Sequence, residues 1–161
     1  MAIYFLDSSA IVKRYFLERG HNWIRVLHES AKRSELYISQ AAFIEVVASI
    51  CRKAREQNIP VEVRDTIINS FRQGVWRSYG VRLVDETLYT AAGDLCRSYK
   101  LRSYDAVQLA CAIAVRTGKE ALEVELSEPN PPDFVFVSGD IKLLDIALAE
   151  GFRVEDPNNY S

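Results

Sequence analysis

Two short apolar runs, at residues 3–6 and 134–137, contain no polar residue. Unbroken runs of this length are typical of parallel strands that are buried on both faces of a sheet. Further short apolar segments at 36–39, 81–84 and 152–154 predict three more strands. The hydrophobic pattern therefore predicts five short strands spread along the whole chain.

Helical spacing of apolar residues fills the intervals between these strands. It predicts helices at 9–16, 22–33, 41–55, 60–72, 86–98, 103–116 and 141–149. Gly151 is expected to end the last of them, because glycine is favoured just after a helix C-terminus. Strands that alternate with helices indicate an α/β fold, with a parallel sheet covered on both faces.

The segment 118–133 departs from this regular pattern. It contains five acids and three prolines, and apolar and acidic residues alternate over 122–126. We expect a surface insertion at about this position, with an edge strand over 122–126.

Composition limits the classes of protein to which the chain can belong. Its 161 residues suit a single domain over 1–161, and 48% hydrophobic with 26% charged residues is ordinary for a globular protein. The formal charge of −2 gives no basic excess, so any contact with nucleic acid must come from a local patch or from bridging metal ions.

Neither the cysteines nor the N-terminus indicates an extracytoplasmic protein. Cys51, Cys96 and Cys111 form no CxxC pair and lie in apolar helical contexts, so we expect core packing in a reducing compartment. The N-terminus has no basic region and reaches an acid at residue 7, and no segment has the length and apolarity of a membrane span. A cytoplasmic location is expected.

Two acids lie in helical segments that offer them no evident polar face. Glu45 is the only charged residue within 41–51, and Asp105 is the only one between Arg102 and Arg116. Burying a lone ionised carboxylate costs several kcal/mol unless it is paired or binds a metal. Both acids are therefore candidates for a functional site.

Asp7 and Asp140 each stand just after an apolar strand and just before a helix. If their strands are parallel members of one sheet, both acids lie at its carboxyl edge, where open α/β sheets bind ligands. Four clustered carboxylates repel one another, and a hard cation such as Mg²⁺ or Mn²⁺ relieves that repulsion. Such an ion activates water and neutralises charge that develops on a phosphodiester.

Structural roles compete with this interpretation. Asp7 and Asp140 occupy positions where an aspartate N-cap is favoured, and Asp105 lies in a first turn, where an acid suits the helix dipole. Glu45 has a buried ion pair with arginine as its alternative.

At these residues the chain resembles the PIN-domain ribonucleases, and within them the VapC-type toxins of toxin–antitoxin pairs. The matching segments occur in the family's order and cover essentially the whole chain. They are Phe5-Leu-Asp-Ser-Ser-Ala-Ile-Val, Glu45 in its apolar helix, Tyr104-Asp-Ala-Val-Gln-Leu-Ala and Phe136-Val-Ser-Gly-Asp.

The resemblance implies a three-layer α/β/α sandwich with a five-stranded parallel sheet. It implies that Asp7, Glu45, Asp105 and Asp140 hold one or two Mg²⁺ or Mn²⁺ ions, with Ser8 and Ser138 as supporting residues. RNA is the implied substrate, an antitoxin the implied inhibitor, and a homodimer the implied assembly. Basic residues near these segments are candidates for contacts with the RNA backbone: Lys13, Arg14, Arg52, Lys53, Arg55 and Arg102.

The sequence also departs from the family and leaves alternatives open. Some members carry a further acid where this chain has Lys142, and Asp145 is the nearest substitute. His21 and His28 lie outside the matching segments and are interpreted as surface or packing residues. The alternatives are a PIN-like binding module without activity and, less favoured, a receiver-like signalling domain with Asp85 as its phosphoacceptor.

Overall fold

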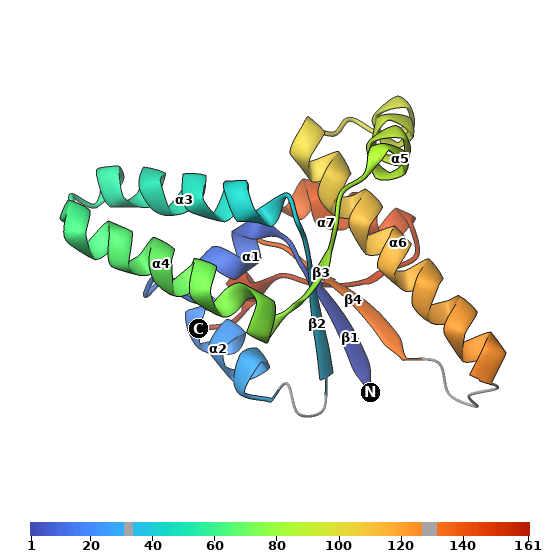
Figure 1. The fold of residues 1–161 in the computed structure, drawn as a ribbon, viewed down its shortest axis with the longest axis horizontal. Coiled ribbons are helices and arrows are strands. Elements are labelled where there is room, and N and C mark those ends of the chain that lie inside the picture. Colours follow the sequence, from blue (N-terminus) through green and yellow to red (C-terminus); the bar gives the residue numbers. More distant parts are fainter. Residues whose placement is uncertain (31–33, 127–131) are drawn as a thin grey trace.

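A computed structural model describes residues 1–30, 34–126 and 132–161. Its strands are β1 (Ala2–Leu6), β2 (Ser34–Ser39), β3 (Gly80–Arg82), β4 (Asp133–Val137) and β5 (Arg153–Glu155). They form one sheet in the order β3-β2-β1-β4-β5, and every neighbouring pair is parallel (Figure 1). The predicted five-stranded parallel sheet is confirmed.

The direction in which successive strands are added to the sheet reverses at β1. The chain builds β2 and β3 on one side of β1 and then places β4 and β5 on the other side. Leu6 is in register with Val137, so the last residues of β1 and β4 lie side by side. Residues that follow these two strands therefore meet at the switch point, the place where open α/β sheets bind ligands.

Seven helices of the described residues flank the sheet (Figure 1). They are α1 (Ser8–Val12), α2 (His21–Glu29), α3 (Ala42–Glu56), α4 (Val61–Ser78), α5 (Glu86–Ser98), α6 (Ser103–Leu126) and α7 (Ile141–Ala149), and a 3-10 helix, η1 (Pro157–Asn159), follows β5. No helix within these described segments is long and apolar enough to span a lipid bilayer.

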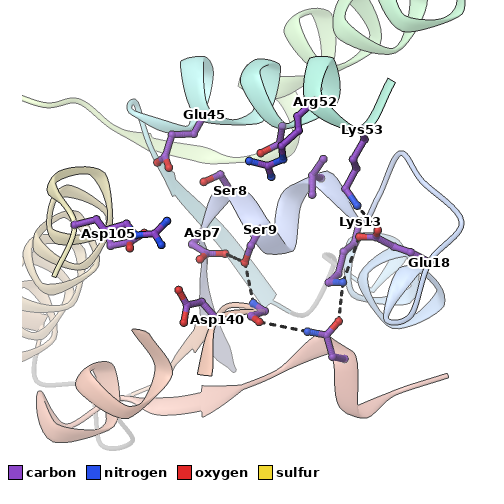
Figure 2. Close-up of a pocket in the computed structure, with 15 residues that line it drawn as sticks. Asp7, Ser8, Ser9, Lys13, Glu18, Glu45, Arg52, Lys53, Asp105 and Asp140 are labelled. Carbon is purple, nitrogen blue, oxygen red and sulfur yellow. Dashed lines mark hydrogen bonds and ion pairs between the residues drawn. The ribbon is translucent and has the colours of Figure 1, made fainter. Parts of the chain in front are cut away.

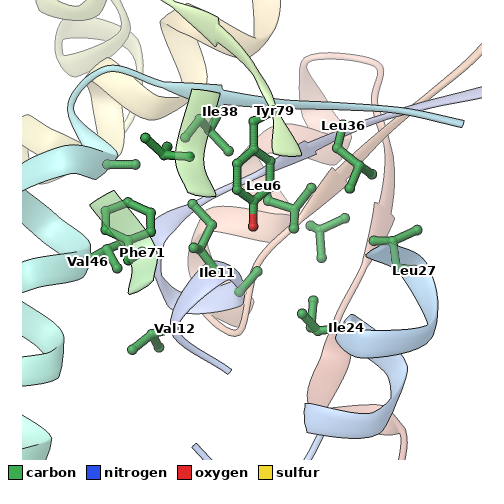
Figure 3. Packing of buried hydrophobic residues seen from close by; sticks show 14 of the residues in the cluster. Leu6, Ile11, Val12, Ile24, Leu27, Leu36, Ile38, Val46, Phe71 and Tyr79 are labelled. Atoms are coloured by element: carbon green, nitrogen blue, oxygen red, sulfur yellow. The ribbon is translucent and has the colours of Figure 1, made fainter. Parts of the chain in front are cut away.

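The helices divide between the two faces of the sheet. Leu6 packs with residues of α1 to α4, among them Ile11, Ile24 and Phe71 (Figure 3). Its neighbour Phe5 belongs to a second cluster, which contains buried residues of α5, α6 and α7. Successive strand residues point to opposite faces, so β1 contributes to both cores. This gives the predicted three layers.

The helix boundaries differ from the predicted ones at several places. The helix predicted at 9–16 ends at Val12, and that predicted at 60–72 continues to Ser78. The helix predicted at 22–33 ends at Glu29 in the described residues, and 31–33 lie outside them. Gly151 has a φ of 85°, and the Phe152 amide donates to the Ala147 carbonyl at 3.0 Å, so the predicted glycine stop is confirmed.

The strand predicted over 122–126 is wrong, because α6 continues through this segment to Leu126. Glu, Ala, Leu and Lys favour a helix, and Leu122 and Leu126, four residues apart, line one hollow with Met1. The Lys119 ammonium lies 2.6 Å from Glu35, close to the start of β2. The described part of the acidic segment is thus at the amino ends of the strands. The remainder of the expected insertion, 127–131, lies outside the described residues.

The three cysteines occupy different environments. Cys111 is buried in α6, and Cys51 is half-buried against the first core cluster. Cys96 is exposed on α5, so the prediction of core packing is wrong for this residue. Leu88 and Ala92, eight and four residues before Cys96 on the same side of α5, are buried, so the buried stripe of the helix ends before Cys96.

Candidate metal centre

All four predicted acids line one cavity of about 410 Å³ at the carboxyl ends of the central strands (Figure 2). Asp7 directly follows β1, and Asp140 comes three residues after the end of β4. Glu45 and Asp105 lie in the first turns of α3 and α6. The fold thus brings together side chains that lie far apart in the sequence.

The Asp7 carboxylate accepts hydrogen bonds from three neutral groups, and no described cation forms an ion pair with it. Its Oδ1 accepts hydrogen bonds from the Ser9 hydroxyl at 2.7 Å and from the Ala10 amide at 3.0 Å. Its Oδ2 accepts one from the Ser138 hydroxyl at 2.6 Å. The bond to Ala10 makes Asp7 the N-cap of α1, so the capping interpretation is correct and coexists with a place in the cavity.

Burial raises the pKa of Asp7 from 3.8 to about 6, although three hydrogen bonds act in the opposite direction. The negative charge of Glu45 adds to the increase. Asp7 is only 4% exposed, so water gives its charge little stabilisation. The hydrogen bonds therefore fix the position of the carboxylate, while burial and the charge of Glu45 disfavour its ionised form.

Two serine hydroxyls connect Asp7 to the loop that carries Asp140. Ser138 donates to Asp7 and accepts from the Asp140 amide at 3.0 Å. Ser9 donates to Asp7 and accepts from the Gly139 amide at 2.8 Å. Ser138 thus lies where the sequence placed it, whereas Ser9 performs the contact expected of Ser8.

Ser8 is buried and lines the cavity beside Glu45 rather than contacting Asp7 (Figure 2). The phase of α1 explains the difference. The Ser9 side chain points toward the Asp7 carboxylate, whereas the Ser8 side chain points toward α3. Both hydroxyls remain in the wall of the cavity.

Asp140 is the most open of the four acids. Its Oδ1 accepts from the Lys142 amide at 2.9 Å and from the Leu143 amide at 3.4 Å, so it caps α7. Capping uses one carboxylate oxygen, and the side chain still lines the cavity. Asp140 therefore combines the two roles in the same way as Asp7.

Glu45 is half-buried, and its partner is an amide. The Gln108 Nε2 donates to Glu45 Oε1 at 2.7 Å. Burial raises the pKa of Glu45, hydrogen bonds from Gln108 and Ser8 lower it, and the charge of Asp105 raises it. The alternative of a buried ion pair with arginine is not what the described residues show, since Glu45 makes no ion pair among them.

Asp105 faces the cavity from the start of α6. Burial raises its pKa, the charge of Asp140 adds to the increase, and Arg102 lowers it. The acids thus act on one another in pairs: Glu45 on Asp7, Asp105 on Glu45 and Asp140 on Asp105. Each of these interactions raises a pKa, so the four negative charges of the cavity destabilise one another.

The opposite wall of the cavity contains a paired carboxylate. Glu18 forms ion pairs with Lys13, at 3.2 Å, and with Lys53. The Lys13 ammonium also donates to the Asn158 side chain at 2.8 Å and to the Arg19 carbonyl at 3.0 Å. Lys13, predicted as an RNA contact, is therefore 7% exposed and fully engaged within the protein.

The other predicted basic residues divide into two groups. Lys53, Arg52 and Arg102 line the cavity. Arg14 and Arg55 do not, and the Arg14 guanidinium instead donates to the Ser78 hydroxyl of α4 at 3.3 Å. Arg14, a candidate for an RNA backbone contact, is thus absent from the lining of the cavity.

The remaining titratable candidates lie elsewhere. His28 is held between the Ile24 carbonyl at 2.7 Å and the Tyr79 hydroxyl at 2.5 Å, so it is a packing residue as expected. His21 contacts the Lys13 carbonyl through Nδ1 at 2.7 Å. Asp145 is exposed on α7 and is absent from the cavity lining.

The donor set of the cavity suits a hard divalent cation. Four carboxylates without an ion pair line it in addition to Glu18, and no described histidine or cysteine does, which favours Mg²⁺ or Mn²⁺ over zinc. Within the described segments, no three acids, histidines or cysteines already have the spacing of a metal site. Mutual repulsion keeps uncompensated carboxylates apart, and a cation draws them together.

Comparison with known proteins identifies the family. Residues 4–118 match the family described as "PIN domain". The chain belongs to the PIN domain family. The match covers Asp7, Glu45 and Asp105, and Asp140 lies beyond its end. Among curated proteins, no match is found.

Solved structures share the fold of this PIN domain over nearly its whole length. VapBC2 from Rickettsia felis, bound to a DNA fragment from its promoter, is 15% identical with a TM-score of 0.60, covering 96% of this chain and 98% of that one. VapBC-1 from nontypeable Haemophilus influenzae is 12% identical with a TM-score of 0.58, covering 96% and 98%. PAE2754 from Pyrobaculum aerophilum is 18% identical with a TM-score of 0.57, covering 98% and 91%.

Two polar residues of the site were not found by sequence reasoning. The sequence predicts Ser8, and not Ser9, as the serine beside Asp7, and it predicts no role for Gln108. A signal was present for Gln108, because it is an uncharged polar residue in the middle of the apolar run 106–115. No comparable signal separates two adjacent serines.

Proposed function

We propose that this PIN domain is a metal-dependent endoribonuclease and the toxin of a toxin–antitoxin pair. The observation that carries the proposal is the arrangement of Asp7, Glu45, Asp105 and Asp140 around one cavity. Neutral donors hold the carboxylates of Asp7, Glu45 and Asp140. Within the part of the chain that is described, none of the four forms an ion pair. Their charge is left for a ligand of opposite sign.

The four carboxylates would hold one or two Mg²⁺ or Mn²⁺ ions, which when bound supply Lewis acidity and an acidified water for phosphodiester hydrolysis. Ser9 and Ser138 fix the Asp7 carboxylate by hydrogen bonds of 2.7 and 2.6 Å. The same hydroxyls hold the Asp140 loop through the backbone amides of Gly139 and Asp140. The residues of the chain thus orient the ligand oxygens before the substrate arrives.

The basic wall of the cavity supports a polyanionic substrate. Arg52 and Arg102 are exposed and line the cavity beside the acids. Guanidinium groups bind phosphate oxygens in a bidentate manner, which positions a backbone without reading its sequence. We assign RNA backbone contacts to Arg52, Arg102 and Lys53, and none to Lys13 or Arg14.

The toxin role and its partners rest on the family and on resemblance. The solved structures with this fold include VapBC complexes of two bacteria. A cognate antitoxin that inhibits the chain and a homodimeric assembly are proposed on the same basis. Co-expression with the product of a neighbouring short reading frame tests the antitoxin, and light scattering tests the dimer.

The central test is cleavage of a fluorescently labelled RNA by the purified chain. Cleavage is expected with Mg²⁺ or Mn²⁺, none with EDTA, and recovery when Mn²⁺ is added back. Isothermal titration with Mn²⁺ separates the rival interpretation of an inactive binding module, which predicts neither cleavage nor ion binding. Cleavage that persists in EDTA contradicts metal dependence.

A receiver-like function has no support in the fold. Asp85, its candidate phosphoacceptor, follows the edge strand β3 and caps α5 by accepting from the Leu88 amide at 2.9 Å. Asp85 is also absent from the lining of the carboxylate cavity. A phosphoacceptor needs the acidic cluster beside it, and Asp85 is on a different part of the sheet edge.

A further inference from the structure

Gln108 is a deeply buried polar residue that contacts one acid of the carboxylate cavity and has no assigned role. It lies in α6 and is 1% exposed. Its Nε2 donates to Glu45 Oε1 at 2.7 Å. Its Oε1 is buried and accepts no hydrogen bond from any described residue.

The unpaired carbonyl oxygen shows that packing alone does not account for this residue. A buried acceptor without a donor destabilises the folded state, and an apolar side chain of the same shape avoids that penalty. Rotating the amide by half a turn would direct the carbonyl oxygen at the Glu45 carboxylate, where two acceptors repel each other. The contact with Glu45 therefore fixes the amide orientation and leaves Oε1 unpaired.

The position of Gln108 on α6 links two of the acids. Asp105 and Gln108 are three residues apart, so both lie on the same side of the helix. Asp105 reaches the cavity directly, and Gln108 holds Glu45, which comes from α3. One helix face thus places one carboxylate and restrains another.

An amide differs from a lysine or arginine in what it does to a carboxylate. It restrains the position of the oxygen by a hydrogen bond without supplying a positive charge. The contact adds no positive charge beside Glu45 and leaves one carboxylate oxygen that Gln108 does not engage. A carboxylate restrained in this way is suited to bind a cation.

We propose that Gln108 is a positioning residue, which holds the Glu45 carboxylate toward the cavity so that a divalent cation binds tightly. The inference rests on the proposed metal-dependent function and adds a residue to it. Gln108 touches no ion or substrate and acts through Glu45 alone.

The test replaces Gln108 by methionine, which has a similar length and shape and no hydrogen-bond donor. Mn²⁺ affinity is measured on the full chain by titration calorimetry, and thermal unfolding is measured without the ion. We expect Gln108→Met to bind Mn²⁺ at least about tenfold more weakly, the size typical of groups that orient a metal ligand. Its unfolding temperature without Mn²⁺ is expected to be equal to or above that of the native chain.

Cys111→Ala is the matched control. Cys111 is buried one turn further along α6 and donates to the Ser39 hydroxyl at 3.3 Å, and it makes no hydrogen bond to Glu45. This variant disturbs the packing of the same helix and is expected to bind Mn²⁺ as the native chain does. Should Gln108→Met fail to fold, Gln108→Leu is measured in its place.

The outcomes separate the two proposals. Native affinity for Mn²⁺ in a folded Gln108→Met or Gln108→Leu chain overturns the role of Gln108 and leaves the proposed function intact. Equal loss of affinity in Cys111→Ala also overturns it, since general packing then explains the effect. A native chain that binds no Mn²⁺ overturns the proposed function itself, and the role of Gln108 with it.

Discussion

The carboxylate cavity contains two acids that are stabilised in opposite ways. Glu18 lies between the ammonium groups of Lys13 and Lys53, and Asp7 lies among the hydroxyls of Ser9 and Ser138. Burial acts to raise the pKa of both. The lysines overcome it and lower the pKa of Glu18, whereas the hydroxyls do not, and the pKa of Asp7 rises to about 6.

Glu18 is neutralised within the fold, whereas the charge of Asp7 is left without a cationic partner among the described residues. A lysine compensates the charge of a buried carboxylate, and the ion pair then needs no further ligand. A hydroxyl or an amide orients a carboxylate and leaves its charge uncompensated. The ionised Glu18 thus stabilises the folded state, whereas the ionised Asp7 destabilises it.

The largest expected effect is on RNA cleavage by Asp7→Asn. Removing the central charge of the cavity is expected to lower the cleavage rate at least about a thousandfold, because the remaining acids hold a divalent ion poorly. Labelled RNA with Mn²⁺ measures the rate, and circular dichroism confirms the fold.

Asp145→Asn is the control for this variant, since it also removes a carboxylate but from an exposed position on α7. It is expected to cleave RNA at the native rate. A folded Asp7→Asn chain with more than a tenth of native activity would show that the unpaired acids are not the active centre.

The second prediction concerns the free energy of unfolding, which removal of the Asp7 charge should raise and removal of the Glu18 charge should lower. The folded-state pKa of Asp7 lies near 6, above its ordinary 3.8, so its contribution is favourable at low pH and is lost as the pH rises through 6. The shift corresponds to about 3 kcal/mol at pH 7. Asp7→Asn is therefore expected to be more stable than the native chain at pH 7, by up to this amount.

Urea unfolding in EDTA at pH 4 to 7 measures the difference between the two chains. His28 titrates in the same range with the opposite sign, because burial lowers its pKa to about 4 and stability is lost as the pH falls below 6.5. Both chains retain His28, so its effect cancels in the difference. A difference that does not grow between pH 4 and 7 would contradict the account of Asp7.

The third prediction is that Glu18→Gln lowers stability at pH 7 by about 2 kcal/mol. The substitution leaves the largely buried Lys13 ammonium without its charged partner. The same urea experiment measures it, with Glu29→Gln as a control on an exposed acid. A Glu18→Gln chain more stable than native would remove the distinction between the two kinds of carboxylate.

The smallest effect is expected from the basic wall. Arg102→Gln is expected to weaken RNA binding about threefold to tenfold and to reduce its salt dependence, since one phosphate contact is lost. Fluorescence anisotropy with Ca²⁺ in place of Mg²⁺ measures binding. Arg14→Gln serves as the control because Arg14 points away from the cavity, and an equal loss in both variants would indicate a general effect of charge.

The sheet and its four acids could be predicted from sequence because the signals are local. Two unbroken apolar runs identify β1 and β4, and an acid just after each must lie at the same sheet edge if the strands are parallel neighbours. Glu45 and Asp105 stand out as single charges in apolar helices. These signals can be found in the sequence because the local pattern of apolar residues indicates which segments are buried.

Other features depend on geometry that no local pattern encodes. Ser8 and Ser9 are chemically identical neighbours, and the phase of a five-residue helix decides which one contacts Asp7. Arg14 and Lys13 are adjacent cations, yet one turns to α4 and the other to Asn158, 145 residues further along the chain. The alternation over 122–126 fits a strand and a helix equally, and helix-forming residues upstream decide the outcome.

The hydrogen bond from Ser138 to Asp7 joins residues that are 131 positions apart. It forms only after β4 has entered the sheet beside β1, whereas β1, β2 and β3 can pair within the first half of the chain. Contacts of such sequence separation carry a large loop-closure entropy and form slowly. Partly folded chains that lack β4 therefore cannot bring the four acids together, and we expect the proposed ribonuclease activity to appear in refolding experiments only after β4 has paired with β1.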